Sequence, residues 1–223
     1  MRTRTSYLKQ LDKLGRHVAA LGKGVVDSIR DTGFAISEGN EEAAQEVIDG
    51  HSVSEHLHRS IEDSCMNIML LQSPMASDLR MVTATFRAIS DLARIEEMAY
   101  ETALLSQETD LTLAPAFAQQ LGDMSQRAAT MLERAMEAFN SSDVEGAESV
   151  FLMDDAVDKI FDAVRADIIT LLRQGDDAAT IAPELLTIAK YYERMGDHAQ
   201  SICDWAIFRA TGEYRGRFMV EEE

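Results

Sequence analysis

Two pairs of carboxylates, each spaced four residues apart, are the feature of this sequence most able to do chemistry. Glu193 and Asp197 form one pair, and Asp154 and Asp158 form the other, with Asp155 beside it. On a helix, residues four apart point from one face, one turn from each other. If the two segments are neighbouring antiparallel helices, four or five carboxylates converge. Such a cluster repels itself unless a hard cation neutralises it.

The phase of the surrounding apolar residues predicts where this cluster lies. Glu193 and Asp197 fall outside the apolar seam of their segment, and Asp154 and Asp158 flank the seam of theirs. We therefore expect the cluster on the surface of a helical bundle. Oxygen-only ligation suits magnesium, calcium, manganese or ferric iron. An ordinary solvated acidic face is the other interpretation, because a chain with 39 acidic residues contains such spacings by chance.

Composition limits the class of protein. The chain has 223 residues, of which 46% are hydrophobic and only 3 are Pro, a mixture that favours helix over sheet. The formal net charge of −18 argues against nucleic acid as a partner, because phosphate contacts need clustered Lys and Arg. Cys65 and Cys203 lie in apolar helical patterns and are expected to be reduced core thiols. With no apolar signal region in the sequence, we expect a cytoplasmic protein.

Six long helices are predicted from apolar residues at three- and four-residue spacing. The apolar patterns cover residues 11–25, 40–71, 79–95, 117–139, 150–171 and 185–206. Asn40 is the expected cap of the second helix, and Arg94 aligns with Arg194 in a weak internal repeat. We predict an all-α fold of two tandem antiparallel three-helix bundles, formed by residues 1–108, a linker at 109–115, and residues 116–223.

Three segments of the chain resemble signatures of the PhoU family. They are QSPMASDLR at 72–80, YERMGDHA at 192–199 and the stretch from Trp205 to Glu213. The resemblance covers nearly the whole chain and implies two three-helix bundles, each usually with paired acidic motifs that bind metal at the surface. It implies a metal ion with ligands at Asp154, Asp158, Glu193 and Asp197 and a possible contribution from Asp155. We expect a divalent or trivalent ion, with iron, manganese, magnesium and zinc as the candidates.

The first half of the chain departs from the family pattern. By register, His51 and Glu55 stand where the first acidic pair is expected, and Ala93 and Glu97 stand where a Glu and an Asp are expected. His51, Glu55 and His58 share one helix face, and Glu97 could approach from the next helix. Mixed nitrogen and oxygen ligation would favour zinc or another transition metal. A decayed site made of ordinary surface residues is the alternative.

Basic residues recur every seven positions in the first 30 residues, opposite the apolar seam. This basic stripe consists of Arg2, Lys9, Arg16, Lys23 and Arg30. The first 30 residues contain seven basic and two acidic side chains in an otherwise acidic chain. Near anionic lipid, each Lys or Arg adds about 1 kcal/mol of attraction. The stripe is therefore either a solvated helix face or a docking surface for a membrane or an acidic partner.

The resemblance to the PhoU family implies a negative regulator of phosphate uptake and of phosphate-responsive signalling. It would act in the cytoplasm, or peripherally at the inner face of the membrane, as a metal-binding adaptor between a phosphate ABC transporter and a sensor histidine kinase. We expect no enzyme activity, because the sequence holds no catalytic triad or phosphate-binding loop, and we expect a homodimer. A metal-dependent oxidase or hydrolase is the alternative, and a purely structural bundle without metal is a third.

Overall fold

The computed structural model describes residues 2–175, 177–215 and 217–218 of the chain, with the side chains of residues 5–175 and 177–215. The described residues form six long α-helices, two 3-10 helices and two short strands. Their bounds are α1 Arg2–Glu38, α2 Glu41–Gln72, α3 Ser77–Glu108, η1 Leu111–Leu113, α4 Pro115–Ser141, α5 Val144–Gln174, η2 Asp177–Ile181, α6 Ala182–Thr211, β1 Glu213–Tyr214 and β2 Arg217–Phe218.

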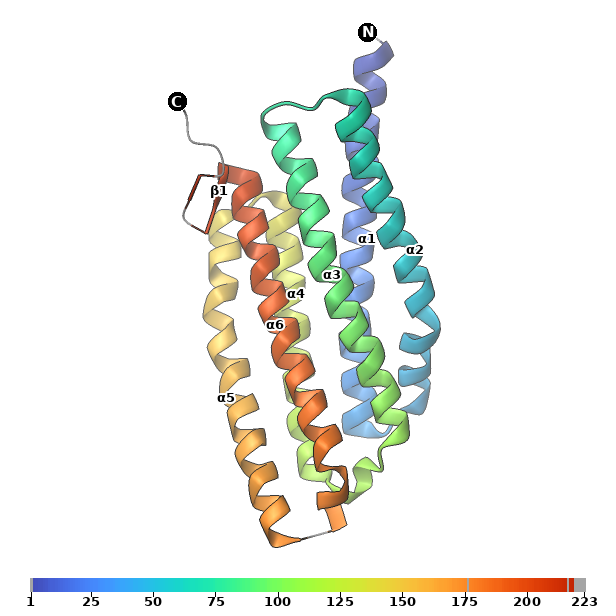
Figure 1. Cartoon of the computed structure of the whole chain (residues 1–223), viewed down its shortest axis with the longest axis vertical. Helices are drawn as coiled ribbons and strands as arrows, with labels where there is room; N and C mark the ends of the chain where they lie inside the picture. The colour runs from blue at the N-terminus through green and yellow to red at the C-terminus, as the bar shows by residue number, and fades with distance from the viewer. Residues whose placement is uncertain (1, 176, 216, 219–223) are drawn as a thin grey trace.

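The helices form two antiparallel three-helix bundles that lie side by side, α1 to α3 and α4 to α6 (Figure 1). This architecture confirms the all-α fold class predicted from apolar spacing. The strands β1 and β2 pair antiparallel after the last helix, with Glu213 opposite Phe218. No helix in the described part of the chain is long and apolar enough to cross a membrane.

Local backbone chemistry sets the ends of the helices. The side chain of Asn40 accepts a hydrogen bond from the Ala43 amide (3.1 Å) and caps α2, as the sequence predicted. Asp143 caps α5 in the same way by accepting from the Gly146 amide. At the end of α6, Gly212 has a φ of 89°, which costs little in a residue without a side chain. These ends fix the positions of α5 and α6, the helices that carry the acidic pairs.

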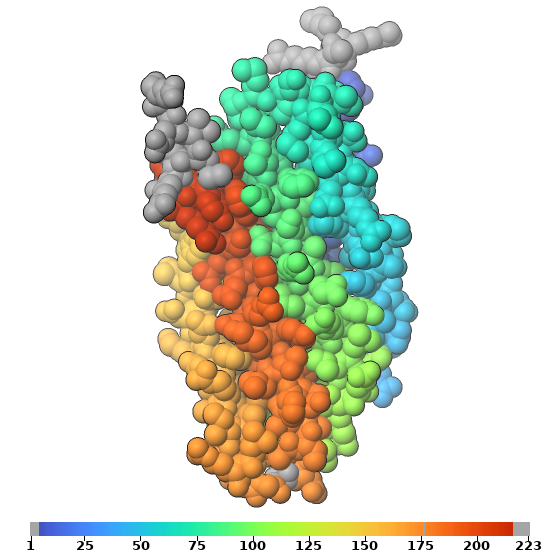
Figure 2. Space-filling model, in the orientation of Figure 1, coloured from blue at the N-terminus to red at the C-terminus, as the bar shows by residue number. Residues whose placement is uncertain are grey.

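One continuous hydrophobic core runs through both bundles. The helix α1 packs against α4 as well as α2 and α3, and α6 packs against α3 as well as α4 and α5. Figure 2 shows α3 and α6 side by side along one face. Between the bundles, the fully buried Tyr192 donates a hydrogen bond to Thr32 Oγ1 (3.0 Å). Gly122 lets α4 approach α1, because a Cβ there would lie 2.9 Å from the Ser37 Cβ.

Both cysteines are free and buried, Cys65 in α2 and Cys203 in α6. Burial raises the pKa of each thiol to about 12. Both thiols are therefore neutral at pH 7 and pack as small apolar side chains, in agreement with the apolar patterns around them.

Hydrogen bonds between polar side chains link α3 to α6 at the edge of the core. One carboxylate oxygen of Asp91 lies 2.8 Å from His198 Nδ1, and the other accepts a hydrogen bond from the Ser201 hydroxyl (2.9 Å). The side chains of Asp91 and His198 are only 16% and 23% exposed. Water and salt therefore screen this contact less than they screen a surface ion pair.

We expect Asp91→Ala to lower the free energy of unfolding by about 1–3 kcal/mol, because it leaves His198 and Ser201 without their shared acceptor. Urea unfolding followed by circular dichroism measures this change. Ser90→Ala is the matched control, since the exposed Ser90 hydroxyl reaches only the carbonyl of Phe86. The control should change the free energy by less than about 0.5 kcal/mol. Equal stabilities of the two variants would contradict a role for Asp91 in joining the bundles.

Candidate metal centres

The two carboxylate pairs face each other across the contact between α5 and α6. Asp154 and Asp158 come from α5, and Glu193 and Asp197 come from α6. Burial is the main cause that raises the pKa of Asp154, and a hydrogen bond from Gln200 opposes it. The same pKa is raised further by the charges of Asp158, Asp197 and Glu193. The structure therefore brings the four carboxylates near enough to repel one another.

The carboxylates of this cluster differ in burial. Asp154 Oδ1 is buried and has no hydrogen-bond partner among the residues that the structure describes, and the side chain of Glu193 is 14% exposed. Asp158 and Asp197 are exposed. The possible fifth ligand, Asp155, is also exposed on α5. The cluster thus opens to solvent on one side, while its inner carboxylates lie deeper than the helix phase alone predicted.

Neighbouring residues shape the inner part of the cluster. The Lys190 ammonium lies 2.6 Å from Glu193 Oε2 and forms an ion pair with it, but the angles of this contact are not those of a hydrogen bond. Gly196 leaves room for Asp154, because a Cβ at Gly196 would lie 3.2 Å from Asp154 Oδ1. As the described side chains stand, no three or more His, Cys, Asp or Glu residues are arranged to hold a metal ion. A cation would therefore have to displace Lys190 and draw the carboxylates together.

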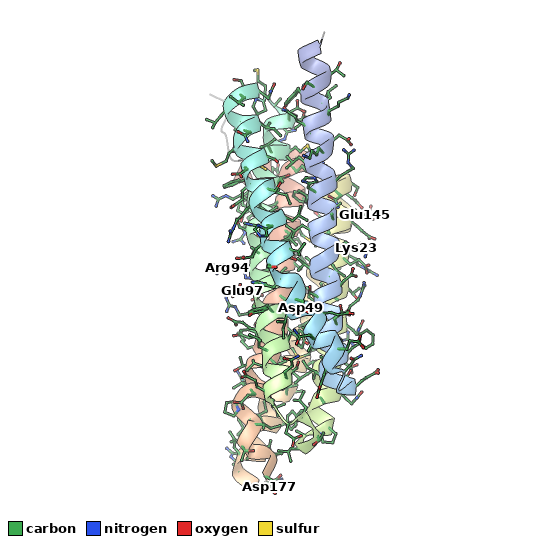
Figure 3. The ribbon with its side chains drawn as sticks, turned by 90° about the vertical axis from the view of Figure 1, so that its right-hand side faces the viewer. Lys23, Asp49, Arg94, Glu97, Glu145 and Asp177 are labelled. Carbon is green, nitrogen blue, oxygen red and sulfur yellow. The ribbon has the colours of Figure 1, made fainter. Side chains whose placement is uncertain are left out.

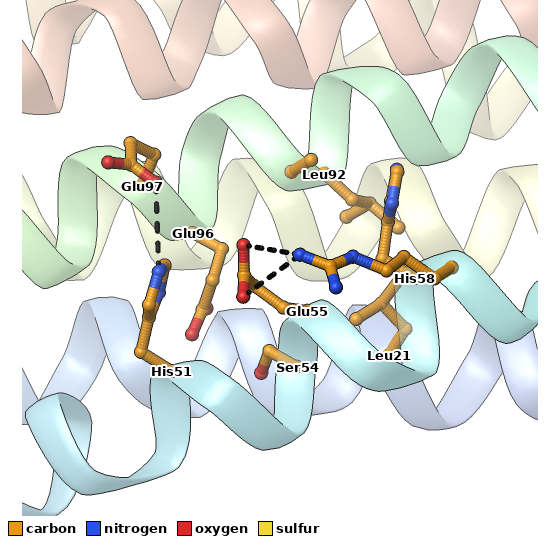
Figure 4. Close-up of a pocket in the computed structure, with 10 residues that line it drawn as sticks. Leu21, His51, Ser54, Glu55, His58, Leu92, Glu96 and Glu97 are labelled. Atoms are coloured by element: carbon orange, nitrogen blue, oxygen red, sulfur yellow. Dashed lines mark hydrogen bonds and ion pairs between the residues drawn. The ribbon is translucent and has the colours of Figure 1, made fainter.

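A cavity of about 220 Å³ opens in the first bundle, where α2 and α3 face each other (Figure 4). His51, Glu55 and Glu97, the candidates from the sequence, all line it, together with His58. His51 Nε2 lies 3.7 Å from Glu97 Oε2. Glu55 instead pairs with Arg59 at 3.4 Å. The structure therefore places these candidates around one space, although Glu55 has another partner.

Glu96 is the residue of this cavity that the sequence analysis missed. It is 4% exposed and reaches from α3 toward Ser54 of α2 (Figure 4). Burial raises the pKa of Glu96, and the nearby hydroxyls of Ser28 and Ser54 oppose this effect. Neither carboxylate oxygen makes a hydrogen bond of ordinary geometry. Its position four residues after the buried Leu92 is the signal that could have revealed it.

The histidines of the cavity also present nitrogens without partners. His51 Nδ1 and His58 Nε2 are buried, and neither makes a hydrogen bond to any of the described residues. The ring of His51 stacks on Tyr100 with 4.3 Å between centroids, which fixes its plane. His58 Nδ1 lies 3.8 Å from Glu62 Oε2. Imidazole nitrogens beside a buried carboxylate are the mixed donor set that transition metals prefer.

The basic stripe is exposed over its first part and turns toward α4 at its end. Lys9, Arg16 and Lys23 are exposed, and Figure 3 shows Lys23 pointing away from the bundle. Arg30 is half-buried, and the side chain of Arg2 lies outside the described residues. A seven-residue repeat drifts by about 20° per repeat around a straight helix. The stripe therefore does not stay on one side of α1.

Carboxylates neutralise part of the stripe. Arg16 pairs with Asp12 on α1, and Lys23 pairs with Asp27 (2.7 Å) one turn later. Arg30 reaches across to Glu133 of α4, also at 2.7 Å. The two pairs within α1, Arg16 with Asp12 and Lys23 with Asp27, are exposed to solvent and therefore weak. Lys9, Arg16 and Lys23 are accordingly available to an anionic surface, whereas Arg30 is part of the contact between the bundles.

Comparison with known proteins places the chain in a family. The sequence pattern described as the PhoU domain matches residues 18–104 and again residues 121–206. The chain belongs to the PhoU family. One match falls in each bundle, which agrees with the internal repeat and confirms the predicted family; the matches include the signature segments at 72–80 and 192–199.

Relatives of similar length carry names from phosphate transport. The chain is 27% identical over 217 residues to "Phosphate-specific transport system accessory protein PhoU homolog 1" of Thermotoga maritima, covering 96% of this chain and 92% of that one. It is 28% identical to the accessory protein PhoU of Serratia marcescens, covering 92% and 84%. The crystal structure of PhoU from Pseudomonas aeruginosa has the same fold, with a TM-score of 0.87 at 24% identity over 93% of this chain and 100% of that one.

We expect Glu96→Gln to stabilise the metal-free protein at pH 7, because it removes a buried carboxylate with poor hydrogen bonding. The folded state raises the pKa of Glu96, so its ionisation costs stability at neutral pH. The gain should shrink as the pH falls and should vanish only well below about 4.3, the ordinary pKa of Glu, where Glu96 is protonated in both states. Urea unfolding in the presence of a chelator measures the change. The control is Glu97→Gln, because Glu97 is the next residue and its side chain is half-exposed. A loss of stability in Glu96→Gln, but not in Glu97→Gln, would contradict this explanation.

Proposed function

We propose that this chain is an accessory protein of a phosphate-specific transport system and regulates phosphate uptake negatively by binding other proteins. The match of the PhoU domain to both bundles carries the proposal. Likeness along nearly the whole chain to proteins named as accessory components of phosphate transport supports it. A carboxylate cluster that opens to solvent suits a structural or bridging ion better than a reaction, which needs an enclosed cleft. We therefore assign no catalytic turnover to the protein.

The partners that we propose are a phosphate ABC transporter and a sensor histidine kinase at the inner face of the membrane. The protein would act from the cytoplasm as an adaptor between them, and lower both uptake and phosphate-responsive signalling when phosphate is plentiful. The exposed cations Lys9, Arg16 and Lys23 offer one surface for such contacts. The strong acidity of the rest of the chain favours orientation of this surface toward acidic partners or anionic lipid.

The metal that we propose for the second bundle is a hard divalent or trivalent ion, with manganese, magnesium or iron the best candidates. Asp154 Oδ1 and Glu193 Oε2 supply buried acceptors without hydrogen bonds, and Asp158 and Asp197 supply exposed oxygens beside them. Bound there, a cation offsets the mutual repulsion of the four carboxylates. The exposed side of the ion would then be available to a partner's carboxylate or phosphate.

For the first bundle we propose a weaker site of mixed donors that favours zinc or another transition metal. His51 and Glu97 already lie close together, and the buried carboxylate of Glu96 lines the same cavity. Glu55 would have to leave Arg59 before it could contribute. The two bundles would accordingly differ in metal preference, because one offers oxygen alone and the other offers nitrogen as well.

We expect Asp197→Ala to weaken manganese binding by about tenfold or more, while helical circular dichroism stays unchanged because Asp197 is exposed. Elemental analysis after loading with manganese and removal of excess ion measures the bound metal. Asp167→Ala is the matched control, since this exposed carboxylate of α5 accepts a hydrogen bond from Gln120 of α4 (3.3 Å) and lies more than two helical turns beyond Asp158. The control should keep its metal. Equal metal content in the two variants would show that the metal does not bind at the proposed site.

We expect the tagged protein to capture a phosphate ABC transporter from membranes of phosphate-replete cells. A variant that carries Lys9→Gln, Arg16→Gln and Lys23→Gln should capture several-fold less, because three exposed cations are lost while the core is untouched. Mass spectrometry of the eluted proteins measures capture. The control is Lys159→Gln, an exposed cation on α5. Capture of no transport or signalling component by the parent protein would contradict the proposed function.

A further inference from the structure

The end of the molecule at the α2–α3 turn exposes an apolar surface that neither the metal centres nor the basic stripe explains. Twelve large apolar side chains are exposed among the described residues, and six of them lie here. These six form what we call the apolar tip: Leu8 (55% exposed), Met66 (48%), Leu70 (75%), Leu71 (73%), Met75 (80%) and Leu79 (42%). In Figure 1 the turn lies near the upper end of the first bundle, beside the N-terminal part of α1, which extends beyond it. A gathering of this kind marks an interaction site.

The chain at the apolar tip carries no charge. Residues 64–77 contain no Asp, Glu, Lys or Arg, although 27% of the whole chain is charged. The core does not require this composition, since Cys65 and Ile68 of the same turns already supply its buried side chains. The exposed positions between them would ordinarily hold polar or charged residues. Their apolar character therefore points to contact with something other than water.

The backbone of the turn holds the tip outward. Ser73 and Ala76 have φ values of 46° and 48°, a left-handed region that residues with a Cβ rarely adopt. Pro74 and Met75 lie between them, and Met75 is the most exposed side chain of the tip. Strained backbone persists where the surrounding structure or a function maintains it. Here the strain keeps a large apolar side chain in solvent.

Basic side chains of α1 lie beside the apolar tip. Tyr7 of α1 donates a hydrogen bond to Asp78 at the start of α3 (2.9 Å), so the first turns of α1 lie beside the tip. Residues 2–16 and 62–80 together contain six basic and four acidic residues, a small positive excess within a chain of net charge −18. Apolar side chains flanked by Lys and Arg are the composition of surfaces that bind anionic membranes.

We propose that the apolar tip inserts into the headgroup region of an anionic lipid bilayer, with Lys9, Lys13 and Arg16 contacting lipid phosphates. The proposal deepens the proposed function, since it says how the adaptor reaches the inner face of the membrane. A second copy of the chain fits less well, because pairing two tips brings two basic ends together. The acidic remainder of the molecule is repelled by the same lipids. It therefore stands away from the bilayer, with the carboxylate cluster of α5 and α6 free to meet partners.

The test uses the purified full chain and vesicles of phosphatidylcholine with or without phosphatidylglycerol. Sedimentation should show binding to the anionic vesicles alone. Leu70→Ser combined with Leu71→Ser should weaken binding by about tenfold or more, because it removes apolar contact without changing charge. Ile169→Ser combined with Leu172→Ser is the matched control, since these exposed side chains lie on α5 near its C-terminal end, opposite the tip (Figure 1). The control should bind like the parent.

Binding at high salt distinguishes insertion of the apolar tip into the bilayer from purely electrostatic attraction to anionic lipid. At about 1 M salt, where the Debye length is about 3 Å, the parent should keep part of its binding and the Leu70, Leu71 variant should lose all of it. A polarity-sensitive dye attached through Met75→Cys should shift its emission to the blue on anionic vesicles. The dye is selective for this position because Cys65 and Cys203 are buried. Circular dichroism checks that the variants fold, and Met75→Ser gives a second test if the double variant does not.

Three results would overturn the proposal. The first is equal vesicle binding by the parent and the Leu70, Leu71 variant, or no binding by either. The second is a blue shift without vesicles together with a dimer in sedimentation, which would show that a second copy covers the tip. The third is binding only to a parallel set of vesicles reconstituted with membrane proteins, which would make a protein the occupant. Because the phosphatidylcholine and phosphatidylglycerol vesicles hold no protein, binding to them is independent of whether the chain regulates phosphate uptake in cells.

Discussion

The burial of α6 on three sides is the constraint on which the rest of the structure depends. Its core side chains Tyr192, Met195 and Ala199 are fully buried among α3, α4 and α5. Glu193 and Asp197, between these positions, are thereby directed toward the acidic turns of α5. Each large apolar side chain contributes about 1.5–3 kcal/mol when buried, so the core can hold mutually repelling carboxylates together. The cluster is a consequence of packing, and a cation bound there would relieve its cost.

The same helix joins the two bundles. Tyr192 reaches Thr32 of α1, and His198 reaches Asp91 of α3. Both contacts lie within two turns of the carboxylates on α6. The signature segment at 192–199 thus combines core, acidic and joining residues. Its histidine serves the contact with the first bundle, whereas its carboxylates face α5.

The sequence predicted the helices well, because they follow from periodicity along a single segment, and the same periodicity predicted that each acidic pair shares one helix face; the metal site itself stays a prediction. The sequence could not predict which helices pack across the two bundles, since an apolar face does not reveal its partner. Arg30 was expected opposite the core, yet it contacts Glu133 of α4 because α1 packs on both bundles. Glu96 was missed because one acidic residue on an apolar seam barely changes the pattern. The apolar tip became visible only when the burial of each residue was known.

The most direct test of this account is anomalous X-ray diffraction from crystals of the protein soaked in manganese. A peak is expected between α5 and α6, about 2.0–2.6 Å from oxygens of Asp154 and Glu193, as for other hard divalent cations, with the Lys190 ammonium moved away from Glu193. No peak at that place under saturating manganese, with Lys190 still paired with Glu193, would show that the cluster is an ordinary acidic surface and would contradict the account.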